Sequence, residues 1–336
     1  MKQFRFLALV LALTTVSISA CTAPVSGFDR SPRKEGLEGF VETNDVRLQY
    51  LDWGGSGPAL ILIHGLGDNP HKYDDLAPAF TDRFRVIAYA RRGAGASDKK
   101  GPYDIGTLTE DLRGLMDALG IAKADIVGQS SGGDEITEMA IAHPDRVRRI
   151  VYLDGVYDYS DPEFRVVEKA LPSWVFGRPA SVMASLDAFR WYEKATWFSD
   201  LDDMQRVEAF LRGNVVTQSD GSLMDITPKE VEDARQAAFH TNKRRDYLRI
   251  RSPALALVSE HALDVNSPDT QRRNDAIAWE QNYWRPFQTH SVEHLRRDLK
   301  NAEIVKIPGR HVSFWLTHRK QVVSEMNRFF AGHLSP

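Results

Sequence analysis

From Val46 to the C-terminus, short continuous apolar runs alternate with longer stretches in which apolar residues recur every three to four positions. Short apolar runs bounded by turn residues are typical of buried strands, and the 3.6-residue spacing is typical of amphipathic helices. The predicted strands are Val46 to Trp53, Ala59 to Ile63, Arg85 to Ala90, Asp125 to Gly128, Arg148 to Leu153, Ala254 to Val258 and Glu303 to Ile307. Their alternation with helices predicts an α/β fold: a mostly parallel, doubly wound sheet with helices on both faces.

The longest gap between predicted strands runs over residues 155–251 and has helical periodicity. A structureless loop of that length would be exceptional, so we expect an inserted helical cap over a core made of residues 39–154 and 252–336. The gap is rich in aromatic residues, namely Trp174, Phe176, Trp191, Tyr192, Trp197 and Phe198. Most of them should pack within the cap, and a minority should line an apolar pocket at the carboxyl ends of the strands.

The first 21 residues have the layout of a secretory signal, with Lys2 and Arg5 ahead of an apolar run that is too short to span a membrane. The segment ends in Ile-Ser-Ala-Cys at Cys21, which resembles the bacterial lipobox. That resemblance implies lipid attachment, such as palmitate, at Cys21, the only cysteine of the chain. The following Thr22, which is not aspartate, implies transfer to the outer membrane, facing the periplasm. Residues 22–38 are expected to form a flexible tether.

The formal net charge of −3 gives no reason to expect a nucleic-acid partner. One basic cluster stands out, made of Lys243, Arg244, Arg245, Arg249 and Arg251. Acidic and apolar residues interrupt it, so we interpret it as a solvated helix face.

Residues 126–133 place the motif G-x-S-x-G between a predicted strand and a predicted helix. Gly128 and Gly132 bracket Ser130, and their lack of a Cβ relieves crowding in a sharp strand-to-helix turn. Such a turn exposes a serine hydroxyl for attack on a carbonyl carbon. Ser130 is therefore the candidate nucleophile.

A serine nucleophile needs a general base, and His311 is the best placed histidine because it follows the last predicted strand. The oxyanion formed by the attack needs two backbone N–H donors. Ser131, directly after the nucleophile, and Leu66, in the His64 to Gly67 turn after an early strand, fit those positions.

With these motifs, the chain from Gly39 onward resembles enzymes of the α/β-hydrolase fold. A further segment, Ala-Arg-Arg-Gly-Ala-Gly-Ala-Ser at 90–97, resembles the family's D-x-R-G-x-G-x-S loop, although Ala90 replaces the usual aspartate. The resemblance implies a cap inserted after the sixth strand of that fold and a catalytic triad in the chain order serine, acid, histidine.

The acid of that triad is left open by the sequence. Family enzymes usually carry it after the seventh strand, where Asp264 and Glu260 both miss the expected spacing. Asp154 is the alternative, because the segment ending there resembles haloalkane dehalogenases whose acid ends the sixth strand. Either aspartate would orient the imidazole and stabilise its protonated form.

A serine at this position favours acyl transfer, since the dehalogenases and epoxide hydrolases of the fold attack saturated carbon with a carboxylate. The predicted function is hydrolysis of an ester or related acyl bond in a small to medium-sized molecule, with no metal or organic cofactor. Peptidase, lipase, thioesterase and lactonase chemistry share this machinery. The rival from another class is an inactive hydrolase fold that serves as an envelope binding module.

A second enzyme class is suggested by the run from His290 to His294, which matches the zinc motif H-x-x-E-H. A third ligand and a matching fold are missing, so we interpret these residues as a solvent-facing part of a helix.

Overall fold

The structure is a computed structural model that describes residues 34–332. Cys21 and residues 22–33 of the predicted tether lie outside the described residues. Strand β1 begins at Leu37, so the last two residues assigned to the tether belong to the sheet. Within residues 34–332, no helix combines the length and the apolar character needed to cross a membrane.

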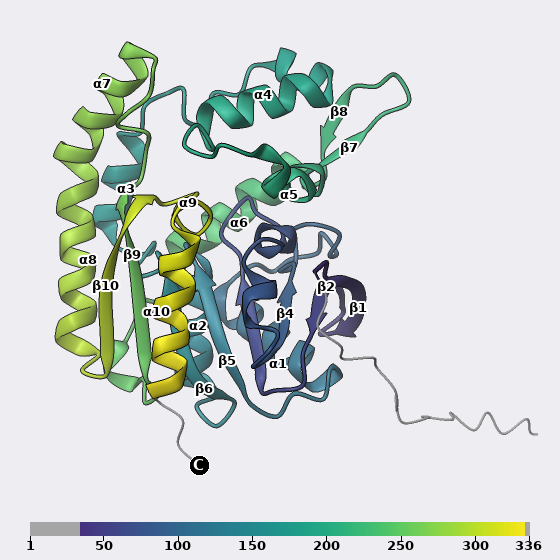
Figure 1. Cartoon of the computed structure of the whole chain (residues 1–336), viewed down its shortest axis with the longest axis vertical. Helices are drawn as coiled ribbons and strands as arrows, with labels where there is room; N and C mark the ends of the chain where they lie inside the picture. Colours follow the sequence, from purple (N-terminus) through teal and green to yellow (C-terminus); the bar gives the residue numbers. More distant parts are fainter. Residues whose placement is uncertain (1–33, 333–336) are drawn as a thin grey trace, which may run out of the picture.

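The core is one eight-stranded sheet in the order β1-β2-β4-β3-β5-β6-β9-β10 (Figure 1). Its strands are β1 (Leu37–Thr43), β2 (Val46–Gly54), β3 (Ala59–Ile63), β4 (Arg85–Tyr89), β5 (Ala124–Gln129), β6 (Val147–Leu153), β9 (Ala254–His261) and β10 (Ala302–Arg310). The pairs β1/β2 and β2/β4 are antiparallel, and all other pairs are parallel. All seven predicted strands are present, and β1 is the one that the apolar pattern missed, because it is an edge strand with exposed, polar positions.

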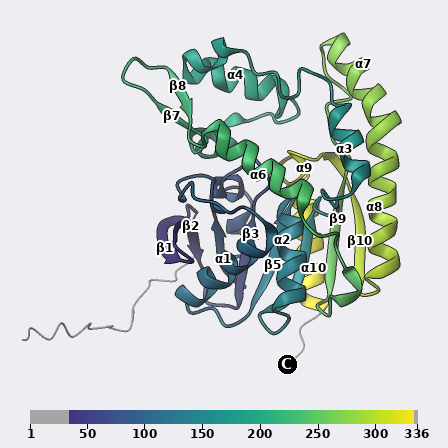
Figure 2. The same ribbon diagram turned by 180° about the vertical axis from the view of Figure 1, so that it is seen from behind.

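Helices cover both faces of this sheet (Figures 1 and 2). On one face, α1 (Ile105–Ala118), α2 (Gly132–Ala142) and α8 (Arg285–Asp298) pack on alternate strand residues such as Ile61 and Ile63. On the other face, the 3₁₀ helices η1 (Pro70–Tyr73) and η2 (Ala77–Phe80) and helix α10 (Arg319–Gly332) pack on Leu60 and Leu62. This two-residue alternation of fully buried side chains confirms the expected doubly wound α/β fold.

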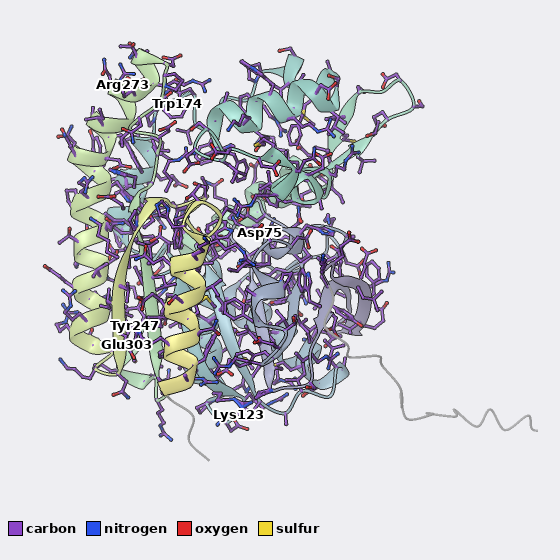
Figure 3. The ribbon with its side chains drawn as sticks, in the orientation of Figure 1. Asp75, Lys123, Trp174, Tyr247, Arg273 and Glu303 are labelled. Carbon is purple, nitrogen blue, oxygen red and sulfur yellow. The ribbon has the colours of Figure 1, made fainter. Side chains whose placement is uncertain are left out.

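Between β9 and β10 the chain runs through α7 (Thr270–Trp279), the π-helix η6 (Glu280–Trp284) and α8, and α9 (Phe314–Thr317) precedes α10. Figure 3 shows where the amino ends of two parallel strands lie. Lys123, just before β5, and Glu303, at the start of β10, are both in the lower part of the molecule. The carboxyl ends of the parallel strands therefore point up, toward the inserted segment. Ligand sites of open α/β sheets lie at this edge.

The segment between β6 and β9 forms the cap over that edge (Figure 1). It contains α3 (Pro162–Lys169), η3 (Ala180–Ala184), α4 (Leu186–Thr196), η4 (Met204–Val207), α5 (Glu208–Arg212), β7 (Val215–Thr217), β8 (Leu223–Asp225), α6 (Lys229–Thr241) and η5 (Tyr247–Arg249). It is mainly helical, as expected, but the β7/β8 hairpin was not predicted. Two strands of three residues are too short to give a clear alternating pattern.

The basic cluster near the end of the cap is not the solvated helix face that the sequence suggested. Residues 242–246 are not helical, and Arg245 is buried, whereas the other four basic residues are exposed. The Arg245 guanidinium donates to Asp134 Oδ1 on α2 at 2.6 Å and to the carbonyl oxygen of Gly155 at 2.6 Å. This arginine thereby ties the end of the cap to the helix that follows Ser130.

Candidate active site

Ser130 lies in the sharp turn between β5 and α2. Its φ angle is 51°, in the left-handed region that costs a residue with a Cβ about 1 kcal/mol or more. The strain is held by buried elements on both sides, since β5 is entirely buried and α2 packs against it. The turn places the Ser130 side chain in the wall of a cavity between the core and the cap.

A chain of hydrogen bonds joins Ser130, His311 and Asp154. His311 follows β10, and its Nε2 lies 3.0 Å from Ser130 Oγ. On the other side of the ring, His311 Nδ1 lies 2.7 Å from Asp154 Oδ2. Asp154 directly follows β6, so the carboxyl ends of β5, β6 and β10 supply the three side chains.

Asp154 is fully buried and accepts hydrogen bonds at both oxygens. Its Oδ1 accepts from the Tyr157 hydroxyl at 2.6 Å and from the Ser259 backbone N–H at 2.9 Å, and its Oδ2 accepts from Ser259 Oγ at 2.5 Å as well as from His311. Gln288 on α8 donates to Tyr157 Oη and to the Ser259 carbonyl oxygen, which fixes both donors. The carboxylate is thus compensated for its burial and aimed at His311.

The structure does not bring the other candidate acids to His311. Asp264 Oδ2 accepts from the Ser199 hydroxyl of the cap, and Asp264 Oδ1 accepts from the Asn266 backbone N–H. The Glu260 side chain makes no hydrogen bond or ion pair within residues 34–332. Both residues lie at or beyond the end of β9, where the chain turns away toward α7, whereas Asp154 ends the strand between β5 and β9.

The two candidate oxyanion donors line the cavity together with Ser130. Across the part of the chain that the structure describes, neither the Leu66 nor the Ser131 backbone N–H is engaged by a hydrogen-bond acceptor. Gly65 permits the close approach of this loop, because a Cβ added there would lie 3.0 Å from Ser130 Cβ.

His64 holds the peptide group that carries the Leu66 N–H. The backbone N–H of Arg91 donates to His64 Nε2 at 3.2 Å, so the ring proton is on Nδ1, which donates to the Gly65 carbonyl oxygen at 2.7 Å. Burial lowers the pKa of His64 well below its ordinary value, and the nearby Arg91 lowers that pKa further. The ring stays neutral, and it fixes the orientation of the peptide between Gly65 and Leu66.

The cavity above Ser130 has a volume of about 730 Å³. Its aromatic wall comes from α3, α4 and the segments around α5 and η6, and includes Phe164, Phe189, Trp197, Phe198, Phe210, Trp279 and Trp284. Figure 3 shows Trp174, which follows α3, close to Arg273 near the upper end of α7; the Trp174 indole N–H donates to Asp275 at 3.3 Å. The expected apolar pocket is therefore present, enclosed jointly by the cap and the α7 region.

The acidic residues that line this cavity are paired with one exception. The pairs are Asp68 with Lys72, Asp225 with Arg178, Asp233 with Lys229, Glu232 with Arg235 and Glu168 with His240. Glu193 on α4 is the exception, since its carboxyl group has no hydrogen-bond or ion-pair partner within residues 34–332. Burial is the main cause that raises the pKa of Glu193 to about 7, and Arg178 opposes the shift.

Tyr159 contacts the nucleophile from the cap side, with 3.0 Å between Tyr159 Oη and Ser130 Oγ. Sequence reasoning missed Tyr159, Tyr157 and Ser259. Ser259 lies beside Asp154 because Leu153 pairs with Leu257 in the parallel β6/β9 ladder, a register that the apolar pattern alone does not indicate. The two tyrosines depend on the path of the chain after β6, which no pattern indicates.

The zinc-like motif on α8 separates into two unrelated contacts. His290 Nδ1 lies 2.7 Å from Glu163, and His294 Nε2 lies 3.1 Å from Asp298. Nowhere within residues 34–332 do three or more His, Cys, Asp or Glu side chains gather in a way that could hold a metal ion.

Similar proteins agree with this fold. The fluoroacetate dehalogenase of Burkholderia sp. is 34% identical over 152 residues, which cover 42% of this chain and 50% of the relative. This chain thus spans about half the length of that curated relative.

Two solved structures are also similar over most of the chain. The E-2-(acetamidomethylene)succinate hydrolase has a TM-score of 0.68 at 18% identity and covers 88% of this chain and 99% of its own. The enol-lactonase of Burkholderia xenovorans LB400 has a TM-score of 0.58 at 21% identity and covers 87% of this chain and 100% of its own. Residues 58–316 match the family model described as alpha/beta hydrolase fold. The chain therefore belongs to the α/β-hydrolase family.

Proposed function

We propose that the protein hydrolyses an ester or related acyl bond through a Ser130-His311-Asp154 triad. The observation that carries the proposal is the continuous hydrogen-bonded chain from Ser130 Oγ through His311 to Asp154, at 3.0 and 2.7 Å. These distances are within the range at which a base takes a proton from a serine hydroxyl.

In the first half of the reaction, Ser130 Oγ attacks the substrate carbonyl carbon while its proton moves to His311 Nε2. Asp154 accepts from His311 Nδ1 and stabilises the imidazolium that forms. The negative charge that develops on the carbonyl oxygen is stabilised by the preorganised N–H groups of Leu66 and Ser131, which donate to no acceptor within residues 34–332.

In the second half, the tetrahedral intermediate collapses, and His311 Nε2 gives its proton to the leaving group. A water molecule then attacks the acyl-enzyme with His311 as the base. The carboxylic acid leaves, and Ser130 regains its proton.

Two alternatives have less support. The intact hydrogen-bonded chain and the large cavity favour an active hydrolase over a binding module with a degraded site, because the irregular segment around Asp264 does not need to supply the acid. Dehalogenation, the activity in the name of the Burkholderia relative, is disfavoured because this chain has Ser130 where carbon–halogen cleavage in the fold uses a carboxylate.

The mainly aromatic wall and the volume of about 730 Å³ support a substrate with an apolar acyl portion of small to medium size. Lactones and other cyclic acyl compounds are included in this class. Peptides are less favoured, because the cap encloses the space above Ser130.

The test is hydrolysis of p-nitrophenyl acyl esters of graded chain length, with Ser130→Ala and the control Ser173→Ala, an exposed serine of the cap. We expect Ser130→Ala to lower kcat by at least about 10³-fold and to abolish labelling by a fluorophosphonate probe, with Ser173→Ala like wild type. Equal rates for wild type and Ser130→Ala on every ester would refute the proposal.

A further inference from the structure

The protonation of the resting site follows from its hydrogen bonds. His311 Nδ1 faces the Asp154 carboxylate, which can only accept, so the ring proton is on Nδ1. His311 Nε2 therefore has a free lone pair and accepts the single proton of Ser130 Oγ. Ser130 has no second proton to offer.

The contact between Ser130 and Tyr159 then has only one possible direction. The Tyr159 hydroxyl donates, and Ser130 Oγ accepts, across 3.0 Å. Burial raises the pKa of Tyr159 above its ordinary value, so the hydroxyl keeps its proton at any pH at which the enzyme would operate. No other acceptor for this hydroxyl exists within residues 34–332.

The Tyr159 ring is held by aromatic residues of the cap. Phe164 on α3 contacts it edge to face, with 4.7 Å between ring centroids, and Phe239 on α6 lies 6.5 Å away. The backbone is anchored nearby, because Asp158 accepts from the Arg245 N–H at 3.1 Å. The O–H donor is therefore fixed in place and is delivered to the nucleophile from the cap rather than from the sheet.

We propose that Tyr159 is a catalytic residue of the acyl-transfer reaction and the third donor to the substrate's carbonyl oxygen. This inference rests on the proposed function. When the bond between Ser130 Oγ and the carbonyl carbon forms, the proton of Ser130 passes to His311 Nε2 and the carbonyl π electrons move to the carbonyl oxygen. Oγ becomes an ether-type oxygen and a weaker acceptor.

The released Tyr159 O–H then has a negatively charged oxygen nearby, two bonds from its former partner Oγ. The oxyanion oxygen is bonded to the same carbon as Oγ, so a small rotation of the hydroxyl brings the donor to it. His311 donates its proton to the leaving group, so Tyr159 is not needed there. The oxyanion instead gains a hydrogen-bond donor that the carbonyl oxygen lacked in the ground state. An interaction that strengthens in this way lowers the barrier of the chemical step. Tyr159 keeps its proton throughout.

The experiment compares Tyr159→Phe with wild type on a series of acetate esters of phenols and alcohols that differ in leaving-group pKa. Tyr103→Phe is the matched control, because the Tyr103 hydroxyl also donates a hydrogen bond, to the Lys99 carbonyl oxygen at 2.8 Å, but Tyr103 does not line this cavity. We expect Tyr159→Phe to lower kcat by about 10- to 100-fold with little change in KM, and by the same factor for every leaving group. Tyr103→Phe should change kcat by less than about threefold, because it loses a neutral hydrogen bond remote from the reaction.

Three results would overturn the proposal. An unchanged or higher kcat in Tyr159→Phe would mean that Tyr159 only occupies the site at rest. A loss that grows with leaving-group pKa would assign the donor to the leaving oxygen instead. If wild type neither turns over the esters nor is labelled by a fluorophosphonate, the proposed function itself fails, and the role of Tyr159 fails with it. Slowed turnover in Tyr159→Phe, with Ser130 still labelled by the fluorophosphonate, supports the proposal. The turnover and labelling of wild type distinguish a failure of the Tyr159 role from a failure of the proposed function.

Discussion

The two halves of the active site are built differently. The core half consists of side chains at strand ends, where β5 before Ser130 is fully buried and Asp154 alone accepts four hydrogen bonds. The cap half buries apolar side chains such as Phe189 and Leu211, but many of its ion pairs join partly exposed side chains, such as Asp225 with Arg178, and Trp191 and Phe176 are 72% and 70% exposed.

This difference indicates which half of the site tolerates substitutions. Exposed ion pairs contribute only about 0 to 1 kcal/mol each, whereas removing a partner from a buried hydrogen-bonded group costs more. The core half therefore keeps the reacting groups in fixed positions. The exposed positions of the cap can be exchanged at little cost in stability, so we expect the cap to set substrate choice. Tyr159 is the point where the two halves meet.

The largest expected effect comes from exchanging the two candidate acids. Asp154→Asn should lower kcat by about 10³- to 10⁴-fold, because an amide does not stabilise the imidazolium and permits the wrong tautomer. Asp264→Asn, which loses only its contacts with Ser199 and Asn266, should stay within about threefold of wild type. Ester kinetics at saturating substrate measures both, with thermal melting to confirm folding. A steep loss in Asp264→Asn alone would place the acid after β9 instead of after β6 and would contradict the Asp154 assignment.

A substitution of glycine tests the rigidity of the two halves. A Cβ at Gly133 would lie 1.9 Å from the Gly155 carbonyl oxygen, so Gly133→Ala must push α2 away from the chain after Asp154. We expect a loss of about 3 kcal/mol in the free energy of unfolding. Gly221→Ala in the cap hairpin has open space and only a φ of 84° to oppose it, which predicts a loss of about 1 kcal/mol. Denaturant unfolding of both variants gives the comparison, and equal losses would contradict it.

The smallest effect concerns Glu193, the unpaired carboxyl group in the cap. Its folded-state pKa is raised to about 7, above the ordinary 4.5, so the folded protein holds a proton that the unfolded chain has lost. Wild type should therefore lose stability as the pH rises from about 4.5 to 7, with no further loss above that. Glu193→Gln lacks this loss and should become the more stable protein above pH 7.

Thermal melting from pH 4 to 9 measures the difference between Glu193→Gln and wild type. Asp202→Asn, an exposed residue of the cap, changes the net charge equally and serves as the control. A constant difference between Glu193→Gln and wild type across this range would show that the carboxyl group is not buried from solvent as described.

Much of the core could be predicted because its signals are local. Each parallel strand is a short apolar run, and the turn around Ser130 needs small residues on both sides of the serine, so seven strands and the positions of Ser130 and His311 could be located in the sequence. The edge strand β1 and the β7/β8 hairpin were not predicted, since their apolar runs are short and many of their residues are exposed.

Three properties can be read from the sequence alone: the order of the elements, the family resemblance and the residue types able to carry acyl transfer. Only the tertiary structure decided that His311 faces Asp154 rather than Asp264, and that Tyr157, Ser259 and Tyr159 surround the reacting groups. The reason is physical: a strand or an elbow depends on neighbours a few residues apart, whereas the partner of a buried carboxylate depends on which strand ends lie side by side. Asp154 and His311 are 157 positions apart, and packing of the sheet brings them together.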